Sequence, residues 1–314
     1  MQHRHLKPLW TLVVIVLCSA LLAACGRAGA TDWDGEVAID GSSTVLPISQ
    51  AVAEEFIRAH GSARISIGQS GTGGGFEKFC RGDIDISDAS REIRDEEAAT
   101  CAEHDIQPIE LSVANDGLSI VVNPDNDWVD CLTVEQLKAI WGPDSNVSSW
   151  QDVDPRFPDE PVRLFGPGTD SGTFDYFTDV IVGDEGASRS DYSATEDDNV
   201  TVQGVGGEKG GLGYFGLSYY EENAGTLKAL EIDGGDGCVA PTVENAQNGT
   251  YKPLARPLFV YVENGSIGRP EVKAFLEYMI DEAQSIAETA GFVPLTPEQQ
   301  EQARKALTTA EAAG

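Results

Sequence analysis

The sequence predicts an α/β protein of two lobes with a ligand-binding cleft between them. Strand-like segments alternate with segments of helical apolar spacing along most of the 314 residues, and such alternation is typical of a mostly parallel sheet flanked by helices. Three loops between a strand and a helix are rich in Ser, Thr and Gly. Parallel α/β sheets bind ligands beyond the carboxyl ends of their strands, so these loops are the expected binding site.

The first half of the chain contains three strand–loop–helix units. Strands are expected at residues 36–40, 64–68 and 83–87 because their residues alternate or are apolar over a short run. The apolar residues of 48–59 recur at helical spacing, and a glycine-rich segment opens a second helix that runs through Phe79.

The second half contains one further unit of this kind. In chain order we expect a long strand at 111–123, a capped helix from Thr133 to Trp141, a strand at 162–165, a helix over 174–181, a glycine-rich turn and strand at 204–216, a strand at 258–262, a helix over 272–279 and a last helix from Pro297. The chain is expected to cross between the lobes near 111–115 and to return near 254–258. Lobe I would then hold residues 36–113 plus 255–314, and lobe II residues 114–254.

The N-terminus has the pattern of a processing signal. Two basic residues precede an apolar run over 10–22, which is too short to span a membrane comfortably, and the run leads into the sequence LAAC at Cys25. This is typical of a bacterial lipoprotein signal, with a secretory signal and a chance cysteine as the alternative. We expect residues 1–24 to be removed, 25–35 to form a tether, and lipid on Cys25 to hold the protein at the outer face of a cell membrane or in the periplasm.

The chain is strongly acidic. Its formal net charge is −31, which becomes −33 without residues 1–24 because these include two basic residues and no acidic one. Such a surface argues against nucleic acid and anionic membranes as partners, since both attract the opposite sign. An anion site on it has to work through local hydrogen bonds and dipoles, because the long-range field repels the ligand. High-salt adaptation or solubility would explain the acidity.

Four cysteines lie beyond the first 25 residues. An even number outside the cell predicts disulfides, and of the three possible pairings we favour Cys80–Cys101 with Cys131–Cys238, which puts one bridge in each half. Zinc is the alternative. No Cys-x-x-Cys pair is present and only two histidines lie beyond the signal, so no metal site is expected.

The three Ser/Thr/Gly loops have the composition of an anion site. They are residues 41–44 (GSST), 70–75 (SGTGGG) and 169–173 (TDSGT), each directly ahead of an expected helix. A helix N-terminus offers unpaired N–H groups and the positive end of the macrodipole, hydroxyls add donors, and glycines let the backbone approach a ligand. Together they predict helix ends that converge on a small oxyanion, with ordinary helix capping as the alternative.

The third loop is also similar to two protease signatures. The sequence DSG over 170–172 occurs in the nucleophile loop of trypsin-like serine proteases, which need an oriented histidine base. Aspartic proteases need two copies of a related aspartate motif, and this chain has one. His60 and His104 have no recognisable motif context. We therefore expect neither catalytic activity nor a cofactor.

Asp88 and Arg91 follow the third expected strand and suit an oxyanion site, although exposed charges after a strand also occur in solvated turns. The guanidinium of Arg91 can hold two oxygens in its fork. An ionised Asp88 only accepts hydrogen bonds, so it can bind only an oxygen that carries a proton. Hydrogen phosphate has such a proton at neutral pH and sulfate has none. A carboxylate in the site therefore selects phosphate over sulfate.

Four segments together resemble the phosphate-binding lipoproteins of ABC-type high-affinity phosphate importers. They are, in the order of that family, residues 40–47 (DGSSTVLP), 70–76 (SGTGGGF), 85–91 (DISDASR) and 168–174 (GTDSGTF). The likeness covers nearly all of the chain after the signal. It implies a two-lobed periplasmic-binding-protein fold of type II, with the ligand in the interlobe cleft and closure around a hinge.

The resemblance also implies a role for individual residues. It assigns Ser43, Thr44 and the N–H of Val45 to the first helix end, Thr72 and more weakly Ser70 to the second, Ser171, Gly172 and Thr173 to the third, and Asp88 as the carboxylate acceptor. One position departs from the family. Known members carry an arginine four residues before the serine that matches Ser171, but this chain has Pro167 there, and Arg91 is the expected substitute.

The expected function is capture of hydrogen phosphate outside the cytoplasm and its delivery to the permease of a phosphate ABC transporter. The expected partners are inorganic phosphate, that permease and, through the lipid, the membrane; we expect a monomer and no nucleic acid. Two alternatives stay open. One is a binding protein for sulfate, molybdate or arsenate, and the other is a secreted phosphoester hydrolase, for which the sequence shows neither a metal cluster nor an activated nucleophile.

Overall fold

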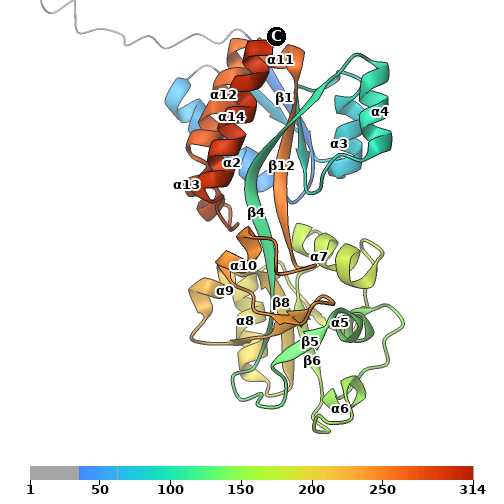
Figure 1. Cartoon of the computed structure of the whole chain (residues 1–314). Helices are drawn as coiled ribbons and strands as arrows, with labels where there is room; N and C mark the ends of the chain where they lie inside the picture. Colours follow the sequence, from blue (N-terminus) through green and yellow to red (C-terminus); the bar gives the residue numbers. More distant parts are fainter. Residues whose placement is uncertain (1–34, 62, 314) are drawn as a thin grey trace, which may run out of the picture.

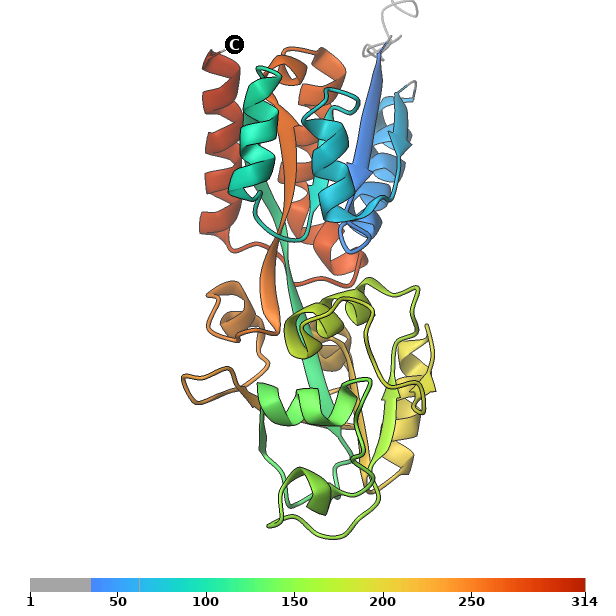
Figure 2. The ribbon, with the colours of Figure 1, turned by 90° about the vertical axis from the view of Figure 1, so that its right-hand side faces the viewer.

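The computed structural model describes residues 35–61 and 63–313, which form two α/β lobes (Figures 1 and 2). The expected signal at 1–24, Cys25 and nearly all of the expected tether lie outside the described residues. No helix in the described part of the chain is long and apolar enough to cross a membrane.

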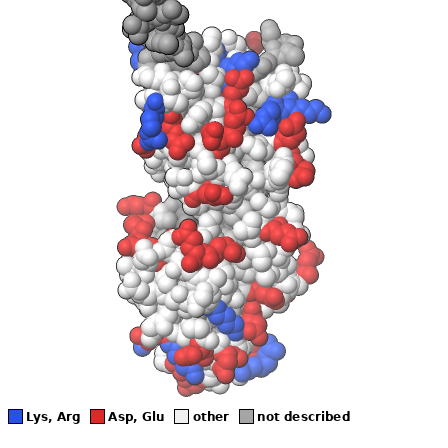
Figure 3. Space-filling model, turned by 90° about the vertical axis from the view of Figure 1, so that its left-hand side faces the viewer, with Lys and Arg blue, Asp and Glu red and all other residues white. Residues whose placement is uncertain are grey.

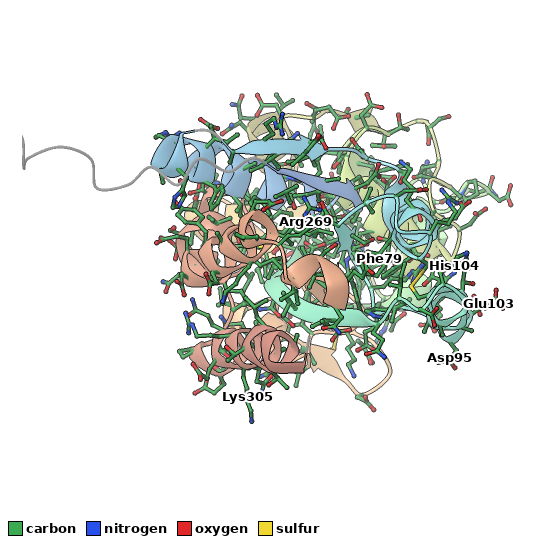
Figure 4. All side chains as sticks on the ribbon, turned by 90° about the horizontal axis from the view of Figure 1, so that it is seen from above. Phe79, Asp95, Glu103, His104, Arg269 and Lys305 are labelled. Carbon is green, nitrogen blue, oxygen red and sulfur yellow. A yellow bond between two sulfur atoms is a disulfide. The ribbon has the colours of Figure 1, made fainter. Side chains whose placement is uncertain are left out.

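Lobe I is the upper lobe of Figure 1. Its strands are β1 (Glu36–Gly41), β2 (Arg64–Ile67), β3 (Ile86–Ala89) and the upper parts of β4 (Pro108–Val122) and β12 (Ala255–Glu263). Its helices are α2 (Leu46–His60), α3 (Gly71–Phe79), α4 (Asp95–Glu103), α11 (Asn264–Ile267), α12 (Pro270–Asp281), α13 (Ala283–Thr289) and α14 (Pro297–Ala313). Seen from above, α4 with Asp95 and Glu103 and α14 with Lys305 lie at the outside of this lobe (Figure 4).

Lobe II is built around the lower part of β4. Its further strands are β5 (Cys131–Thr133), β6 (Arg163–Gly166), β7 (Ser193–Ala194), β8 (Gly211–Gly216), β9 (Lys228–Ala229), β10 (Glu231–Asp233) and β11 (Cys238–Val239), of which β8 and β9 pair with β4. Its helices are α5 (Val134–Trp141), α6 (Trp150–Val153), α7 (Gly172–Phe177), which continues as a π-helical turn (Thr178–Val182), α8 (Asp198–Gly207), α9 (Leu217–Asn223) and α10 (Val243–Gln247). The predicted helix behind Thr133 is confirmed, and its Thr133 and Gln136 cap each other's N–H groups.

The main sheet is mixed, so the expectation of a mostly parallel sheet is wrong for its centre. The strand order is β2-β1-β3-β12-β4-β8-β6-β7, with β9 also paired to β4, and a small separate sheet has the order β11-β10-β5. The pairs β2-β1, β1-β3, β8-β6 and β6-β7 are parallel, as expected for strand–loop–helix units. Strand β12 returns from lobe II and is antiparallel to β4, the strand that leaves lobe I, and also to β3. Strand β4 is antiparallel to β8 and β9 as well.

Two local predictions also need correction. The third strand begins at Ile86 instead of residue 83, since the Asp85 side chain already accepts the Ala38 N–H at 3.0 Å where a strand neighbour would pair. The glycines at 204–207 lie in helix α8 and not in a turn. A Cβ on Gly204 would come within 2.3 Å of the Phe165 ring, so this glycine lets the helix approach the sheet.

Strands β4 and β12, here called the connecting strands, run side by side through both lobes (Figure 2). The buried core of lobe I reaches Ala114 on β4 and Leu258 on β12. The core of lobe II begins at Leu118 and Leu254, which pair as neighbours across the same crossing. The two large cores are therefore separate. A small buried cluster of Leu217 and Ala246 from lobe II with Val293 from lobe I joins the lobes, so the apolar contact that would oppose relative motion is limited.

Both predicted disulfides are confirmed. Cys80–Cys101 joins the end of α3 to α4 in lobe I, and Cys131–Cys238 joins β5 to β11 in the small sheet of lobe II.

Candidate anion site in the interlobe cleft

A polar cavity of about 350 Å³ lies where the lobes face each other. Lobe I lines it with the loops after β1, β2 and β3, which are the strand-to-helix junctions that the sequence singled out. Lobe II lines it with α7 and the segment that follows. Five Ser and Thr residues line it, namely Ser42, Ser43, Thr44, Thr72 and Ser90.

The first loop leads from β1 into α2. The Thr44 N–H donates to Ser42 Oγ at 3.2 Å, and Val45 is the residue before the helix begins at Leu46. Ser43 Oγ reaches across the cleft and donates to Asp175 Oδ2 at 3.4 Å, so this hydroxyl already connects the two lobes. Thr44 and Ser43 both face the cavity, whereas Val45 is buried in the core of lobe I.

Of the two residues that the resemblance assigned to the second loop, one lines the cavity and the other does not. Ser70 donates through N–H and Oγ to Asp40 Oδ1, at 2.9 and 2.6 Å, and does not line the cavity. Thr72 lines it, and its hydroxyl accepts the Ser90 N–H at 3.2 Å while lying 3.1 Å from Ser90 Oγ. Ser90 is a cavity hydroxyl that the sequence analysis did not select, although it stands within the DASR segment.

The third loop lies beside the cavity and not in its lining. Ser171 Oγ accepts the Thr173 N–H at 3.2 Å and so caps α7. Gly172 packs against the first loop, since a Cβ there would stand 3.0 Å from Thr44 Oγ1 and 3.2 Å from Thr44 Cα. This close approach brings the N-terminus of α7 against the first loop.

The wall from lobe II is acidic. Asp175, Asp179 and Glu185 line the cavity, opposite Arg91 and Arg94 of lobe I. Burial raises the pKa of Asp175 and of Glu185, and the neighbouring carboxylates Asp175 and Asp179 raise that of Glu185 further. The cavity therefore has both donors for an anion and acceptors for protons that the anion carries.

Asp88 is completely buried behind the first loop and does not line the cavity. Its Oδ1 accepts the Ser49 hydroxyl at 2.8 Å, and its Oδ2 has no hydrogen-bond partner among the described residues. Burial raises the pKa of Asp88 to about 7, with a further rise from the negative Asp40, while the Ser49 hydrogen bond opposes the shift. A carboxyl with an unpartnered oxygen and such a pKa can hold or share a proton near neutrality.

Arg91 lines the cavity, but both terminal nitrogens of its guanidinium already donate hydrogen bonds within lobe I. Nη1 and Nη2 donate to the two carboxylate oxygens of Glu97, both at 2.8 Å, and Nη1 also donates to the Glu92 carbonyl. The guanidinium lies over Phe76, 5.5 Å from the ring centre. Glu97 thus neutralises the charge that the sequence analysis assigned to the anion.

A third cavity arginine, Arg256, comes from β12 and was missed by sequence analysis. Its Nε donates to Asp116 Oδ2 at 3.3 Å, its Nη2 donates to Thr44 Oγ1 at 3.2 Å, and its guanidinium lies 3.5 Å from the centre of the Tyr176 ring. The signal in the sequence was a pair of opposite charges, Asp116 and Arg256, each next to long apolar strand segments.

The structure therefore brings Ser43, Thr44, Thr72 and Arg91 together in one cavity. The other assigned residues lie behind or beside it, namely Val45, Ser70, Asp88, Ser171, Gly172 and Thr173. Their roles in binding stay predictions. Within the described residues, no group of three or more His, Cys, Asp or Glu side chains is arranged to hold a metal ion.

Comparison with known proteins defines first the class and then the family. A family model described as a PBP superfamily domain matches residues 27–283. Protein SphX of Synechococcus elongatus is 48% identical over 262 residues, which cover 82% of this chain and 77% of SphX. The phosphate-binding protein PstS of Staphylococcus saprophyticus is 40% identical over 282 residues, with 88% and 86% covered.

A solved structure agrees with these relatives. The crystal structure of a possible phosphate binding protein from Planctomyces limnophilus superposes with a TM-score of 0.86 at 46% identity, covering 89% of this chain and 99% of that one. The chain belongs to the PBP superfamily and, within it, to the family of SphX and the phosphate-binding protein PstS.

Proposed function

We propose that this protein captures hydrogen phosphate outside the cytoplasm and delivers it to the permease of an ABC-type phosphate importer. The observation that carries the proposal is the interlobe cavity of about 350 Å³, whose walls carry five Ser and Thr residues and three arginines. Hydroxyls and guanidinium groups are donors, and a small oxyanion is the ligand that needs donors on all sides. The PstS relatives named as phosphate-binding make phosphate the first choice.

In this proposal the ligand lies between the three loops. The first loop binds it through Ser43, Thr44 and the Val45 N–H, the second through Thr72 with Ser70, and the third through Ser171, Gly172 and Thr173. Arg91 contributes a positive charge, and Asp88 accepts the proton of the phosphate. Support for Asp88 comes from its buried, unpartnered Oδ2 and from its pKa of about 7, at which a proton is readily shared. Closure of the lobes would bring the third loop into contact with the ligand.

The remaining parts of the proposal concern the context of the protein. We assign it no catalytic activity, a monomeric state, and attachment to the outer face of the membrane through lipid on Cys25. The LAAC sequence at residues 22–25 supports the attachment, and the relatives named phosphate-binding proteins support a binding role.

Titration calorimetry with phosphate and with sulfate tests this function. The protein is prepared without its first 25 residues and titrated with each anion at pH 8, where Asp88 is mostly ionised, together with Asp88→Asn. We expect one phosphate per chain, no heat with sulfate, and partial loss of this discrimination in Asp88→Asn, because the amide no longer repels a proton-free oxygen. Equal binding of sulfate by the wild type would favour a general oxyanion carrier, and no heat with either anion would contradict the proposal.

A further inference from the structure

Arg256 occupies the point at which the lobes and the connecting strands meet. In the antiparallel pair of β4 and β12, Arg256 stands directly opposite Asp116. Its other two partners are Thr44 on the first loop of lobe I and Tyr176 on α7 of lobe II. Ser43 and Asp175, the pair that bridges the cleft, flank these two partners in the sequence.

The surroundings of Arg256 hold its guanidinium in one place. Asp116 is buried, and although burial raises its pKa, the positive charge of Arg256 opposes that shift. A buried carboxylate without a cation is strongly unfavourable, so the pair is kept together. The Tyr176 ring covers one face of the guanidinium, and the Tyr176 hydroxyl is itself tied to the Pro253 carbonyl at 2.7 Å.

These contacts leave donors of Arg256 for a ligand. Nε is used by Asp116 and Nη2 by Thr44, at 3.3 and 3.2 Å, while Nη1 has no hydrogen-bond partner in the described part of the chain. The side chain is 17% exposed and lines the cavity. Arg91 differs, because both of its terminal nitrogens donate to Glu97 at 2.8 Å.

We infer that Arg256 is the principal cation of the anion site and that Asp116 is its positioning residue. The inference rests on the proposed function, which it deepens by naming the residue that carries the charge. An anion held by Arg256 is in contact with a side chain that touches both lobes and belongs to a connecting strand. Ligand binding is thereby tied to the relative position of the lobes.

The test compares Arg256→Gln with Arg91→Gln in phosphate calorimetry, with Arg156→Gln as the control. Arg156 is 84% exposed and pairs with Asp154 away from the cavity, so its variant removes one positive charge without touching the site. Arg256→Gln is expected to weaken phosphate binding roughly 10- to 100-fold, as loss of a charge-assisted hydrogen bond does. Arg91→Gln should lose at least several-fold less than Arg256→Gln, and Arg156→Gln should bind as the wild type does.

A second variant separates binding from folding. Arg256→Gln leaves Asp116 buried without its cation, so the double variant Arg256→Gln/Asp116→Asn is measured beside it, and thermal unfolding without phosphate reports the fold of each. The double variant should fold and still bind phosphate at least tenfold more weakly than the wild type. Binding within about threefold of wild type in the double variant, or a larger loss in Arg91→Gln, would overturn the inference while wild-type binding keeps the proposed function. A wild-type chain that binds no phosphate would overturn both.

Discussion

Asp88 shows how the environment of one residue changes what its chemistry can do. From the sequence it is a carboxylate after a strand, and the resemblance makes it an acceptor in the site. In the fold it is fully buried with one oxygen bonded to Ser49, and its pKa rises to about 7. Between its ordinary value near 4 and pH 7, the folded protein holds a proton that the unfolded chain has released. Raising the pH through this range therefore lowers the free energy of unfolding.

Asp88→Asn should remove this dependence on pH. The variant is expected to be more stable than the wild type at pH 8, by up to about 4 kcal/mol if the whole shift is expressed, and the difference should shrink towards pH 4. Urea unfolding without phosphate at pH 5 and pH 8 measures it. Asp184→Asn, on an exposed residue, is the matched control and should show no such trend. A difference between Asp88→Asn and wild type that stays constant with pH would contradict this account of Asp88.

At the scale of elements, helix α3 is placed by one of its three consecutive glycines. A Cβ on Gly75 would stand 2.7 Å from Gly41 Cα and 2.7 Å from Ser87 Oγ, so this glycine lets the helix lie directly on β1 and β3. Gly73, in the same helix, would meet only Arg91 Nη2 at 3.8 Å. The same local sequence thus contains a glycine required by packing and one that packing does not require.

Alanine at these two positions should have opposite effects on stability. Gly75→Ala is expected to lower the free energy of unfolding by about 1–3 kcal/mol through overpacking against backbone. Gly73→Ala should leave it unchanged or raise it by up to about 1 kcal/mol, because alanine is the better helix former. Urea unfolding at pH 7 gives both values. Equal effects of the two substitutions would show that helix propensity, and not the contact with β1, decides the role of Gly75.

At the scale of the whole molecule, the negative charge of the surface repels the anion that the cavity is proposed to bind. The net charge is −31, and on the face shown in Figure 3 acidic side chains lie on both lobes and on both sides of the waist between them. The cavity is lined by three arginines and three acidic residues, and Glu97 and Asp116 pair with two of these arginines, so the site has no excess of positive charge. A phosphate anion is therefore repelled at a distance and bound only once it meets the donors.

The association rate of phosphate should consequently rise with ionic strength. Raising the salt concentration from about 20 to about 200 mM shortens the Debye length to less than about 8 Å. The long-range repulsion between the protein surface and phosphate is then screened, whereas the hydrogen bonds in the cavity act over shorter distances and are kept. Stopped-flow tryptophan fluorescence measures the rate, and sodium gluconate in place of sodium chloride controls for competition by chloride. An association rate that falls with salt would indicate a positive potential at the cleft and contradict the claim that the acidic surface repels phosphate.

Elements that depend on neighbouring residues could be predicted from the sequence, whereas those that depend on distant contacts could not. Strands β1 and β2 and helices α2 and α5 were expected from periodicity and caps, which are local. The crossings were expected near 111–115 and 254–258 because each half of the chain holds a strand–loop–helix unit. Helix α8 was missed because its glycines normally indicate a turn, and only the ring of Phe165 explains Gly204. The direction of β12 was missed because it depends on where the returning chain joins the sheet.

The sequence by itself determined the hydroxyl and glycine loops, the strand–loop–helix units that carry them, and the acidic surface, since these follow from neighbouring residues and from composition. Only the tertiary structure decided which of the assigned residues line the cavity. It buried Asp88, paired Arg91 with Glu97 and joined Arg256 to Asp116, 140 residues earlier in the chain. The physical reason is that such contacts depend on strand register and on the meeting of two lobes, which no local pattern in the sequence encodes.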